Sequence, residues 1–307
     1  MLTFLLKRLW QYPLILAIIY VVTFLLVWVA PGTPFNTGER TLTPEVEAAL
    51  RQKFNAESAI GFLTYYPFQM IQGNFGPSFN NPNQTVQEII GDRLPISAAL
   101  GALAVVIALI VGVLIGSFAA VRRGGTLDWL STAVALAGVS VPSFVAAAVL
   151  LAVFGFWLRW LPFTQWNFEP AQMILPAIAL SLLPMAYVTR LTRVSMIDTL
   201  SADYVRTARA KGLSRVKVIG KHALRNAVLP VLSFIGPAAA STMVGSFVVE
   251  KVFQIPGLGQ VFVTSVQNRD QTLILGVVMV YSVLLLGLNL LVDIAYTLVD
   301  PRIEVTS

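Results

Sequence analysis

The chain contains 307 residues, of which 56% are hydrophobic and 12% are charged, about half the charged share of a typical soluble domain. A soluble protein of this length cannot bury so much apolar surface, whereas a lipid bilayer accommodates it. The basic residues lie between apolar runs and form no single stripe, which argues against nucleic-acid binding. The lack of cysteine excludes disulfides, thiolate metal sites and a cysteine nucleophile.

Six apolar stretches are long enough to cross a bilayer, which requires about 20 mainly apolar residues. They cover residues 12–30, 96–120, 129–158, 173–188, 230–249 and 273–296. Pro142 interrupts the third stretch and predicts a kinked helix there. The sequence therefore predicts an all-α membrane protein with six transmembrane helices in a single domain, residues 1–307.

The distribution of Lys and Arg predicts the orientation. With the N-terminus in the cytoplasm, 14 of the 21 basic residues fall on the cytoplasmic side, as the positive-inside rule requires. Both termini are then cytoplasmic. Residues 31–95 form a large extracytoplasmic loop with a short helix expected over 85–93, residues 190–229 form a basic cytoplasmic loop, and residues 250–271 form a second extracytoplasmic loop.

The cytoplasmic loop 190–229 is predicted to contain two short helices separated by Gly212. Ser201 or Asp203 can cap the first helix, and Gly212 can take the left-handed position that ends it. Ser214 can cap the second helix. These features predict a folded loop instead of a simple connection.

One face of the first helix in this loop is formed by small side chains. Val205, Ala208 and Gly212 follow helical spacing on an otherwise basic helix. Such a narrow face suits docking into a groove on another protein. Pro230 can then open the next span, because a missing N–H costs nothing at a helix start.

Residues 206–212, followed by 222–225, resemble the cytoplasmic coupling loop of binding-protein-dependent ABC importer permeases, in the form typical of the dipeptide, oligopeptide and nickel group. Arg206-Thr207-Ala208 stands where the general family has Glu-Ala-Ala, and Leu229-Pro230 comes later than in the general signature. Residues 73–79 are similar to the outer loop of the oligopeptide permease B-type subunit of this group. Residues 253–259, 269–270 and 300–302 resemble the family's loop before the last span and its C-terminal end.

The resemblance implies a permease domain of the type I ABC importer kind in the cell inner membrane, with four kinds of partner. These are a second, homologous permease subunit, two ATP-binding subunits, an extracytoplasmic peptide-binding protein and the lipid bilayer. It implies that the coupling loop contacts the ATPase through Tyr204, Val205, Arg206, Thr207, Ala208, Arg209, Ala210, Lys211, Gly212 and Leu213. It also implies contact with the binding protein or the substrate path at Glu250, Phe253, Pro256, Gly257, Gly259, Arg269 and Asp270.

The chain carries no Gly-rich phosphate loop and no paired catalytic motif, so it is expected to be no enzyme and to bind no cofactor. ATP and magnesium are expected on the partner ATPases. The single histidine, His222, argues against a catalytic triad or a histidine metal site. It is read as a residue on a helix surface.

Other functions remain open at this point. Within the same permease role the cargo could be a dipeptide, nickel or another solute instead of an oligopeptide. An ion-coupled secondary transporter would need inverted repeats and acidic residues at mid-membrane depth, yet Asp293 is the only acidic residue well inside a span. A membrane-embedded enzyme would need a catalytic cluster at one depth, and the sequence shows none.

Overall fold

The computed structural model describes residues 2–30, 36–37, 40–41, 45, 48–49, 52, 58–79, 83–162, 166, 169–244 and 247–299. Within these ranges the structure is almost entirely helical. The only strands among them are β1 (Asn36–Thr37) and β2 (Arg40–Thr41), which pair antiparallel. The predicted all-α class is confirmed, while most of residues 31–57, the first part of the expected loop 31–95, lies outside the described residues.

The chain divides into two compact units. Unit 1 comprises the described residues of Met1–Ser97 and Pro256–Gly287, and unit 2 comprises those of Ala98–Ile255 and Leu288–Arg302. The expectation of a single domain, residues 1–307, stays a prediction.

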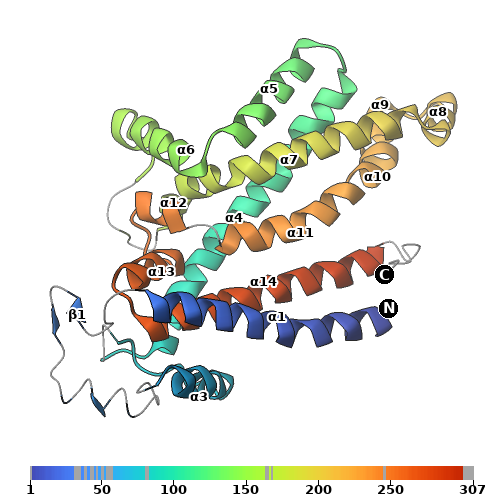
Figure 1. The fold of residues 1–307 in the computed structure, drawn as a ribbon. Helices are drawn as coiled ribbons and strands as arrows, with labels where there is room; N and C mark the ends of the chain where they lie inside the picture. Colours follow the sequence, from blue (N-terminus) through green and yellow to red (C-terminus); the bar gives the residue numbers. More distant parts are fainter. Residues whose placement is uncertain are drawn as a thin grey trace. The chain divides into compact units, whose positions relative to one another are not determined.

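Unit 1 is built around an aromatic core. Its helices are α1 (Leu2–Val29), α3 (Ala59–Ile71), the start of α4 (Val86–Val121), α13 (Leu258–Gln267) and most of α14 (Gln271–Val299) (Figure 1). Phe24 of α1 packs on Phe62 of α3, with ring centroids 6.1 Å apart, and Phe62 stacks on Tyr66 at 4.9 Å. Buried aromatic pairs of this kind add to the hydrophobic stabilisation.

Tyr66 also holds two backbone segments together. Its phenol donates to the carbonyl of Phe75 at 2.9 Å and to that of Thr272 at 3.0 Å. Burial, followed by the nearby charge of Asp270, raises the pKa of Tyr66 well above its usual value. The phenol therefore stays protonated and keeps its donor.

Unit 2 is organised around the long helix α7 (Ile174–Ser201), which packs against α5 (Thr126–Ser140), α6 (Ser143–Leu150) and α11 (Leu229–Val244). Its other elements are the π-helix η1 (Leu151–Trp157), the 3₁₀ helix η2 (Pro170–Met173), α8 (Asp203–Ala210), α9 (Arg215–Lys217), the π-helix η3 (Val218–Leu224), α10 (Arg225–Ala227) and α12 (Phe247–Val252).

Small residues allow α4 to approach α7 closely. A Cβ atom on Gly112 would lie 2.8 Å from the Val188 side chain, and one on Gly116 would lie 2.5 Å from the Thr189 carbonyl oxygen. Two glycines four residues apart are a common device for packing helices in membranes. The two glycines therefore determine how closely α4 and α7 can pack at this crossing.

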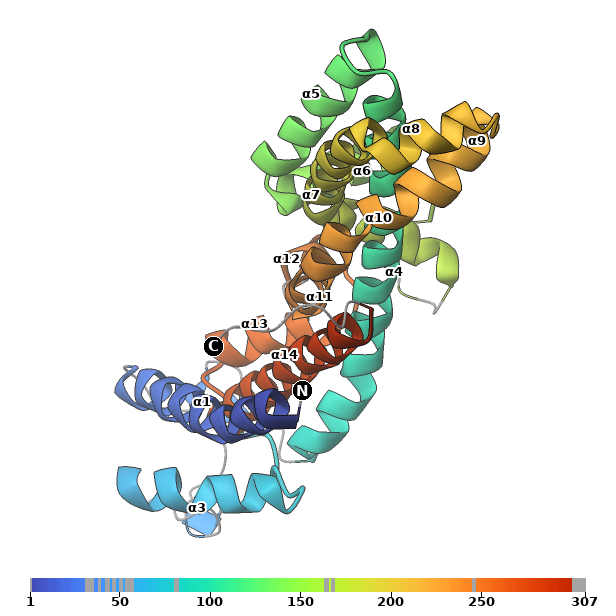
Figure 2. The ribbon, with the colours of Figure 1, turned by 90° about the vertical axis from the view of Figure 1, so that its right-hand side faces the viewer.

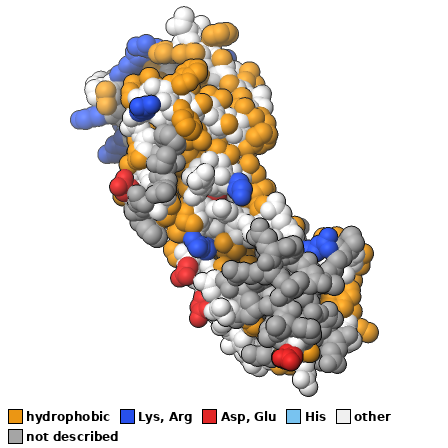
Figure 3. Space-filling model, turned by 90° about the vertical axis from the view of Figure 1, so that its left-hand side faces the viewer, with side chains coloured by type: hydrophobic (Ala, Val, Ile, Leu, Met, Phe, Trp, Pro, Cys, Tyr) orange, Lys and Arg blue, Asp and Glu red, His pale blue; other side chains and the backbone are white. Residues whose placement is uncertain are grey.

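Four helical segments are long and apolar enough to cross a membrane, or up to six if each of two bent pairs counts as one span. The four are Arg8–Val29, Val86–Val121, Pro170–Ser201 and Gln271–Ile294, and the pairs are Thr126–Ser140 with Ser143–Trp157 and Arg215–Ala227 with Leu229–Met243. Large apolar side chains on these helices are exposed, such as Leu26 at 69% and Leu136 at 63%, and hydrophobic side chains cover much of the surface in Figure 3.

Two expected boundaries are wrong, and one expected kink is much sharper than predicted. Residues 85–93 form no separate helix, because α4 runs without a break from Val86. Residues 190–201 continue α7 and are not part of a loop. At Pro142 the chain turns by 107° between α5 and α6, since Val141 and Pro142 both adopt extended backbone there.

Candidate functional site

The strongest candidate surface is the segment that follows α7. Helix α7 ends at Ser201, and α8 begins at Asp203 after the single extended residue Ala202. The expected capping by Ser201 or Asp203 is wrong, because Ala202 is the N-cap and no side chain caps the helix. Movement of α8 is therefore tied to movement of α7 through one residue.

The end of α8 confirms the predicted role of Gly212. Its φ angle is +76°. The Gly212 N–H donates to the Arg209 carbonyl at 3.0 Å, and the Leu213 N–H donates to the Ala208 carbonyl at 3.3 Å. These two bonds form a Schellman motif, which favours glycine at the left-handed position. Ser214 lies at the predicted N-cap of α9 but makes no capping bond through its side chain.

The face of small residues on α8 points inward. Val205 is fully buried and Ala208 is 6% exposed, and both pack with Val218 and Leu200 of the same chain. The expectation that this face docks outward is therefore wrong for these two residues in this structure. They hold α8 against η3 instead, because burying their apolar surface has a lower free energy than exposing it to water.

The opposite face of α8 and its C-terminal turn are open to solvent. The exposed residues are Tyr204, Arg206, Thr207, Arg209, Ala210, Lys211, Gly212 and Leu213. Tyr204 accepts a hydrogen bond from the Asn226 amide at 2.8 Å, which links α8 to α10. Arg206 lies 3.6 Å from Asp203, an exposed pair that contributes little stability.

The base of this segment is anchored in unit 2. Ala223 and Ala227, which are fully buried, pack with Ala120 of α4 and Met196 of α7. Figure 1 and Figure 2 both show α8, α9 and α10 lying together beyond the end of α7.

The single histidine, His222, is half-buried in η3.

A pocket of about 360 Å³ opens beside the C-terminal end of α8. Its lining is apolar apart from two arginines and consists of Val121, Leu200, Arg209, Leu213, Arg215, Val218 and Ile219. An arginine pair around an apolar floor suits a partner side chain that is acidic or that carries an apolar tip.

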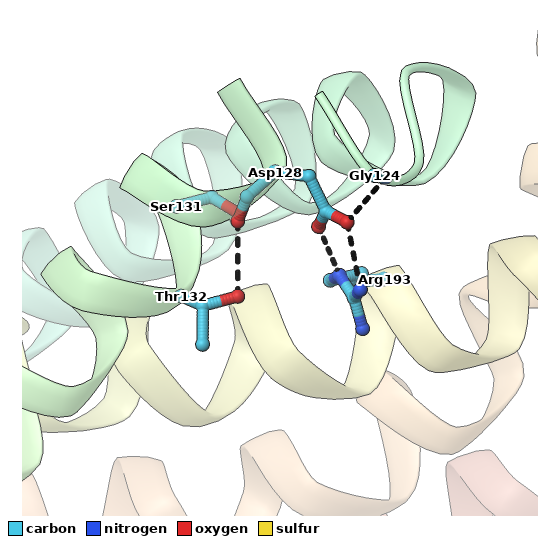
Figure 4. A network of polar contacts seen from close by, with 5 residues as sticks. All are labelled: Gly124, Asp128, Ser131, Thr132 and Arg193. Atoms are coloured by element: carbon cyan, nitrogen blue, oxygen red, sulfur yellow. Dashed lines mark hydrogen bonds and ion pairs between the residues drawn. The ribbon is translucent and has the colours of Figure 1, made fainter. Parts of the chain in front are cut away.

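An ion pair joins α5 to α7 near the same end of unit 2, and sequence reasoning missed it. Two nitrogens of the Arg193 guanidinium donate to the Asp128 carboxylate: Nε to Oδ1, and Nη2 to Oδ2 at 2.9 Å (Figure 4). The Gly124 N–H donates to the same carboxylate at 2.9 Å. The pair spans 65 positions of sequence, so no local pattern could reveal it.

The two extracytoplasmic candidates in unit 2 are buried. Glu250 has no exposed surface and Phe253 is 7% exposed. Gln254 has a φ angle of +55°, and the Ile255 N–H donates to the Glu250 carbonyl at 2.9 Å. The two side chains are not accessible to another protein in this structure, and their contact with the binding protein or the substrate path stays a prediction.

In unit 1, Asp270 is a structural centre. Its carboxylate accepts from the Ser78 hydroxyl, from the Phe79 N–H at 3.2 Å and from the Leu273 N–H at 3.1 Å. It thus caps α14 and holds residues 77–79 against it. Asp270 is 1% exposed, so direct contact with a partner is not available to it here.

Two of the four remaining candidates from the expected loop 250–271 line an open pocket of about 360 Å³ in unit 1. Pro256 and Gly257 line it, and Arg93 donates to the Pro256 carbonyl at 3.3 Å. Gly259 is buried and Arg269 is half-buried, with a φ angle of +57°. Gln84, Asp92, Gln260 and Asn268 make much of the lining polar.

The described residues contain no group of three His, Cys, Asp or Glu side chains that could hold a metal ion.

Comparisons with known proteins agree on one kind of protein. Residues 112–305 match the family described as "Binding-protein-dependent transport system inner membrane component". The chain is 42% identical over 302 residues to the dipeptide transport system permease protein DppB of Bacillus subtilis, covering 98% of this chain and 97% of that protein. It is 41% identical over 307 residues to the oligopeptide transport system permease protein OppB of Salmonella typhimurium, covering 99% and 100%.

A solved structure supports the fold. The crystal structure of an amino acid ABC transporter with histidines contains a chain that matches 68% of this chain and 93% of its own length, with a TM-score of 0.52 and 17% sequence identity. At this identity the likeness concerns the fold only.

Proposed function

Because this chain belongs to the family of binding-protein-dependent transport system inner membrane components, we propose that it is the permease subunit of an ATP-driven importer of short peptides. The observation that carries the mechanism is that α8 is joined to α7 by one residue and presents an exposed basic face. The peptide cargo is supported by relatives named for dipeptide and oligopeptide transport.

The exposed face of α8 is proposed as the contact with the ATPase. It carries Arg206, Arg209 and Lys211, and the pocket below it can receive a side chain of the partner. ATP-driven closure of the ATPases would push on α8, and the buried contacts of Val205 and Ala208 would pass this movement to η3. ATP and magnesium are bound by the partners in this proposal.

The proposed assembly contains this chain, a second homologous permease, two ATP-binding subunits and an extracytoplasmic peptide-binding protein. The chain crosses the inner membrane six times if both bent pairs span it, with both termini cytoplasmic as the Lys and Arg distribution predicts.

The outer pocket of unit 1 is proposed as the contact with the binding protein. Pro256 and Gly257 line it, and Arg269 lies half-buried beside Asp270. The buried Asp270 supports this surface from within, by the hydrogen bonds that hold residues 77–79 to α14.

The test is uptake of a labelled tetrapeptide into proteoliposomes that contain the whole importer. Arg209→Glu reverses a charge on the proposed ATPase contact, whereas Lys221→Glu reverses an exposed charge on η3, outside that contact. We expect ATP-dependent uptake, its loss in Arg209→Glu with the complex still assembled, and its retention in Lys221→Glu.

Other outcomes would contradict specific parts of the proposal. ATP hydrolysis without peptide movement, together with nickel uptake by the same vesicles, would refute the cargo. Peptide uptake that follows an imposed proton gradient and ignores ATP would refute the mechanism. Equal loss in both variants would refute the assignment of the contact to α8.

A further inference from the structure

A groove of about 460 Å³ runs between α5 and α7 in unit 2. Its walls come only from these two helices: Ser131, Thr132, Ala135, Leu136, Val139, Ser140, Ala186, Tyr187, Thr189, Arg190, Arg193 and Val194. From Ser131 to Ser140 it extends about 13 Å at the helical rise of about 1.5 Å per residue. Both helices belong to segments apolar enough to lie in a membrane.

Two hydroxyl groups of α5 that line the groove are already engaged. The hydroxyls of Ser131 and Thr132 donate to the Asp128 carbonyl at 2.8 Å and 3.0 Å. The charge of Arg193 is matched by the Asp128 carboxylate, as Figure 4 shows. The groove is therefore mainly an apolar slot along Ala135, Leu136 and Val139.

Arg190 is the exception. It lies one turn before Arg193 on α7, its side chain is exposed, and it lines the same end of the groove. Among the described residues its guanidinium has no hydrogen bond or ion pair. An unpaired arginine beside an apolar slot, on helices apolar enough to lie in a membrane, favours an anionic ligand with an apolar chain.

We propose that this groove binds one anionic phospholipid, with the phosphate at Arg190 and an acyl chain along Ala135, Leu136 and Val139. A bound lipid satisfies both halves of the groove, because it brings one negative charge and a long apolar chain. A peptide fits less well, since each of its residues carries a donor and an acceptor that the slot does not satisfy. A helix of a second permease would leave Arg190 unpaired unless it carried an acid at that depth.

The test counts bound lipids on the purified importer by native mass spectrometry, with phosphatidylglycerol and phosphatidylcholine of the same acyl chains as probes. We expect preferential binding of phosphatidylglycerol and a drop in its affinity of about fivefold in Arg190→Gln, the factor that corresponds to about 1 kcal/mol per basic side chain beside anionic lipid. Arg190→Lys should restore most of it.

Two further variants make the test specific. Arg225→Gln removes the same charge from an exposed position on α10, outside the groove, and should change nothing. Ala135→Phe fills the slot while keeping Arg190 and should reduce binding of both lipids at this site. Equal effects of Arg190→Gln and Arg225→Gln, or no effect of Arg190→Gln, would overturn the proposal.

A photoreactive residue at position 135 in the complete importer separates the possible occupants. Crosslinking to lipid supports the proposal. Crosslinking to a transported peptide or to the second permease would overturn it, and would assign the groove to the translocation path or to the subunit interface. Lipid binding is measured without transport, so its failure leaves the peptide importer untouched.

Discussion

Replacing Gly212 with alanine tests whether the end of α8 depends on the left-handed backbone at this position. No atom lies within 4 Å of the Cβ position, so the substitution causes no clash and acts through conformation alone. At a φ angle of +76° an alanine costs about 1–2 kcal/mol in conformational strain. The lower entropy of its unfolded chain offsets about 0.4–1 kcal/mol of that cost. We expect a net local loss of about 1 kcal/mol, which corresponds to about fivefold more frequent opening of the turn.

Hydrogen–deuterium exchange of the assembled importer measures this opening directly. The amides of Gly212 and Leu213 are bonded within the Schellman motif and should exchange about fivefold faster in the variant. Peptide moved per ATP hydrolysed should fall in parallel. Gly220→Ala is the matched control, because Gly220 is a helical glycine with nothing within 4 Å, and there alanine should be neutral or stabilising. Unchanged exchange in Gly212→Ala would refute the reasoning.

Three further substitutions should lower the thermal stability of the purified complex. Gly116→Ala should cost about 1–3 kcal/mol, because its methyl group meets the Thr189 carbonyl oxygen at 2.5 Å. Asp128→Asn should cost about 2 kcal/mol, since it leaves the charge of Arg193 without its partner. Tyr66→Phe should cost about 1–3 kcal/mol, because the buried carbonyl of Thr272 and the part-buried carbonyl of Phe75 lose the Tyr66 donor.

Each of these variants has a control with the same chemical change at a site without the contact. Gly91 of α4 has open space at its Cβ position, Asp198 of α7 is exposed, and Tyr65 is 38% exposed beside Tyr66. The stability of each control variant should stay within about 0.5 kcal/mol of the parent protein, and alanine at position 91 should raise it slightly. The controls are Gly91→Ala, Asp198→Asn and Tyr65→Phe. Equal losses in variant and control would show that the named contacts are not the cause.

The features that local sequence determines were predictable. Long apolar runs predicted the membrane helices, because the thickness of a bilayer sets their length. Gly212 predicted the end of α8, since a left-handed residue after a helix is mostly glycine. Helix α3 escaped notice although Ser58 caps it, its Oγ accepting the Gly61 N–H at 3.0 Å, because Pro67 lies inside it and a proline argues against a helix interior.

Features that depend on distant contacts were not predictable. The spacing of Val205 and Ala208 correctly indicated a shared helix face, but only the packing of Val218 and Leu200 decides that this face points inward. The pair of Asp128 and Arg193 connects helices that are far apart in sequence. One amino-acid sequence alone does not indicate which distant residues pair in this way.

The inward direction of Val205 and Ala208 changes how α8 can act. A helix that docked through its only apolar face would be held by the ATPase and loosely attached to its own chain. Here the apolar face binds η3, and Ala223 and Ala227 bind α4 and α7, so the helix is already part of unit 2 before any partner arrives. In the proposed importer, force from the ATPase on its exposed basic face would therefore move packed helices instead of deforming a loop, because closely packed interiors transmit displacement. Under this reasoning, weakening the Val205–Val218 contact should uncouple ATP hydrolysis from transport even though both side chains are hidden from the ATPase, and the measurement is the number of peptides moved per ATP in Val205→Ala.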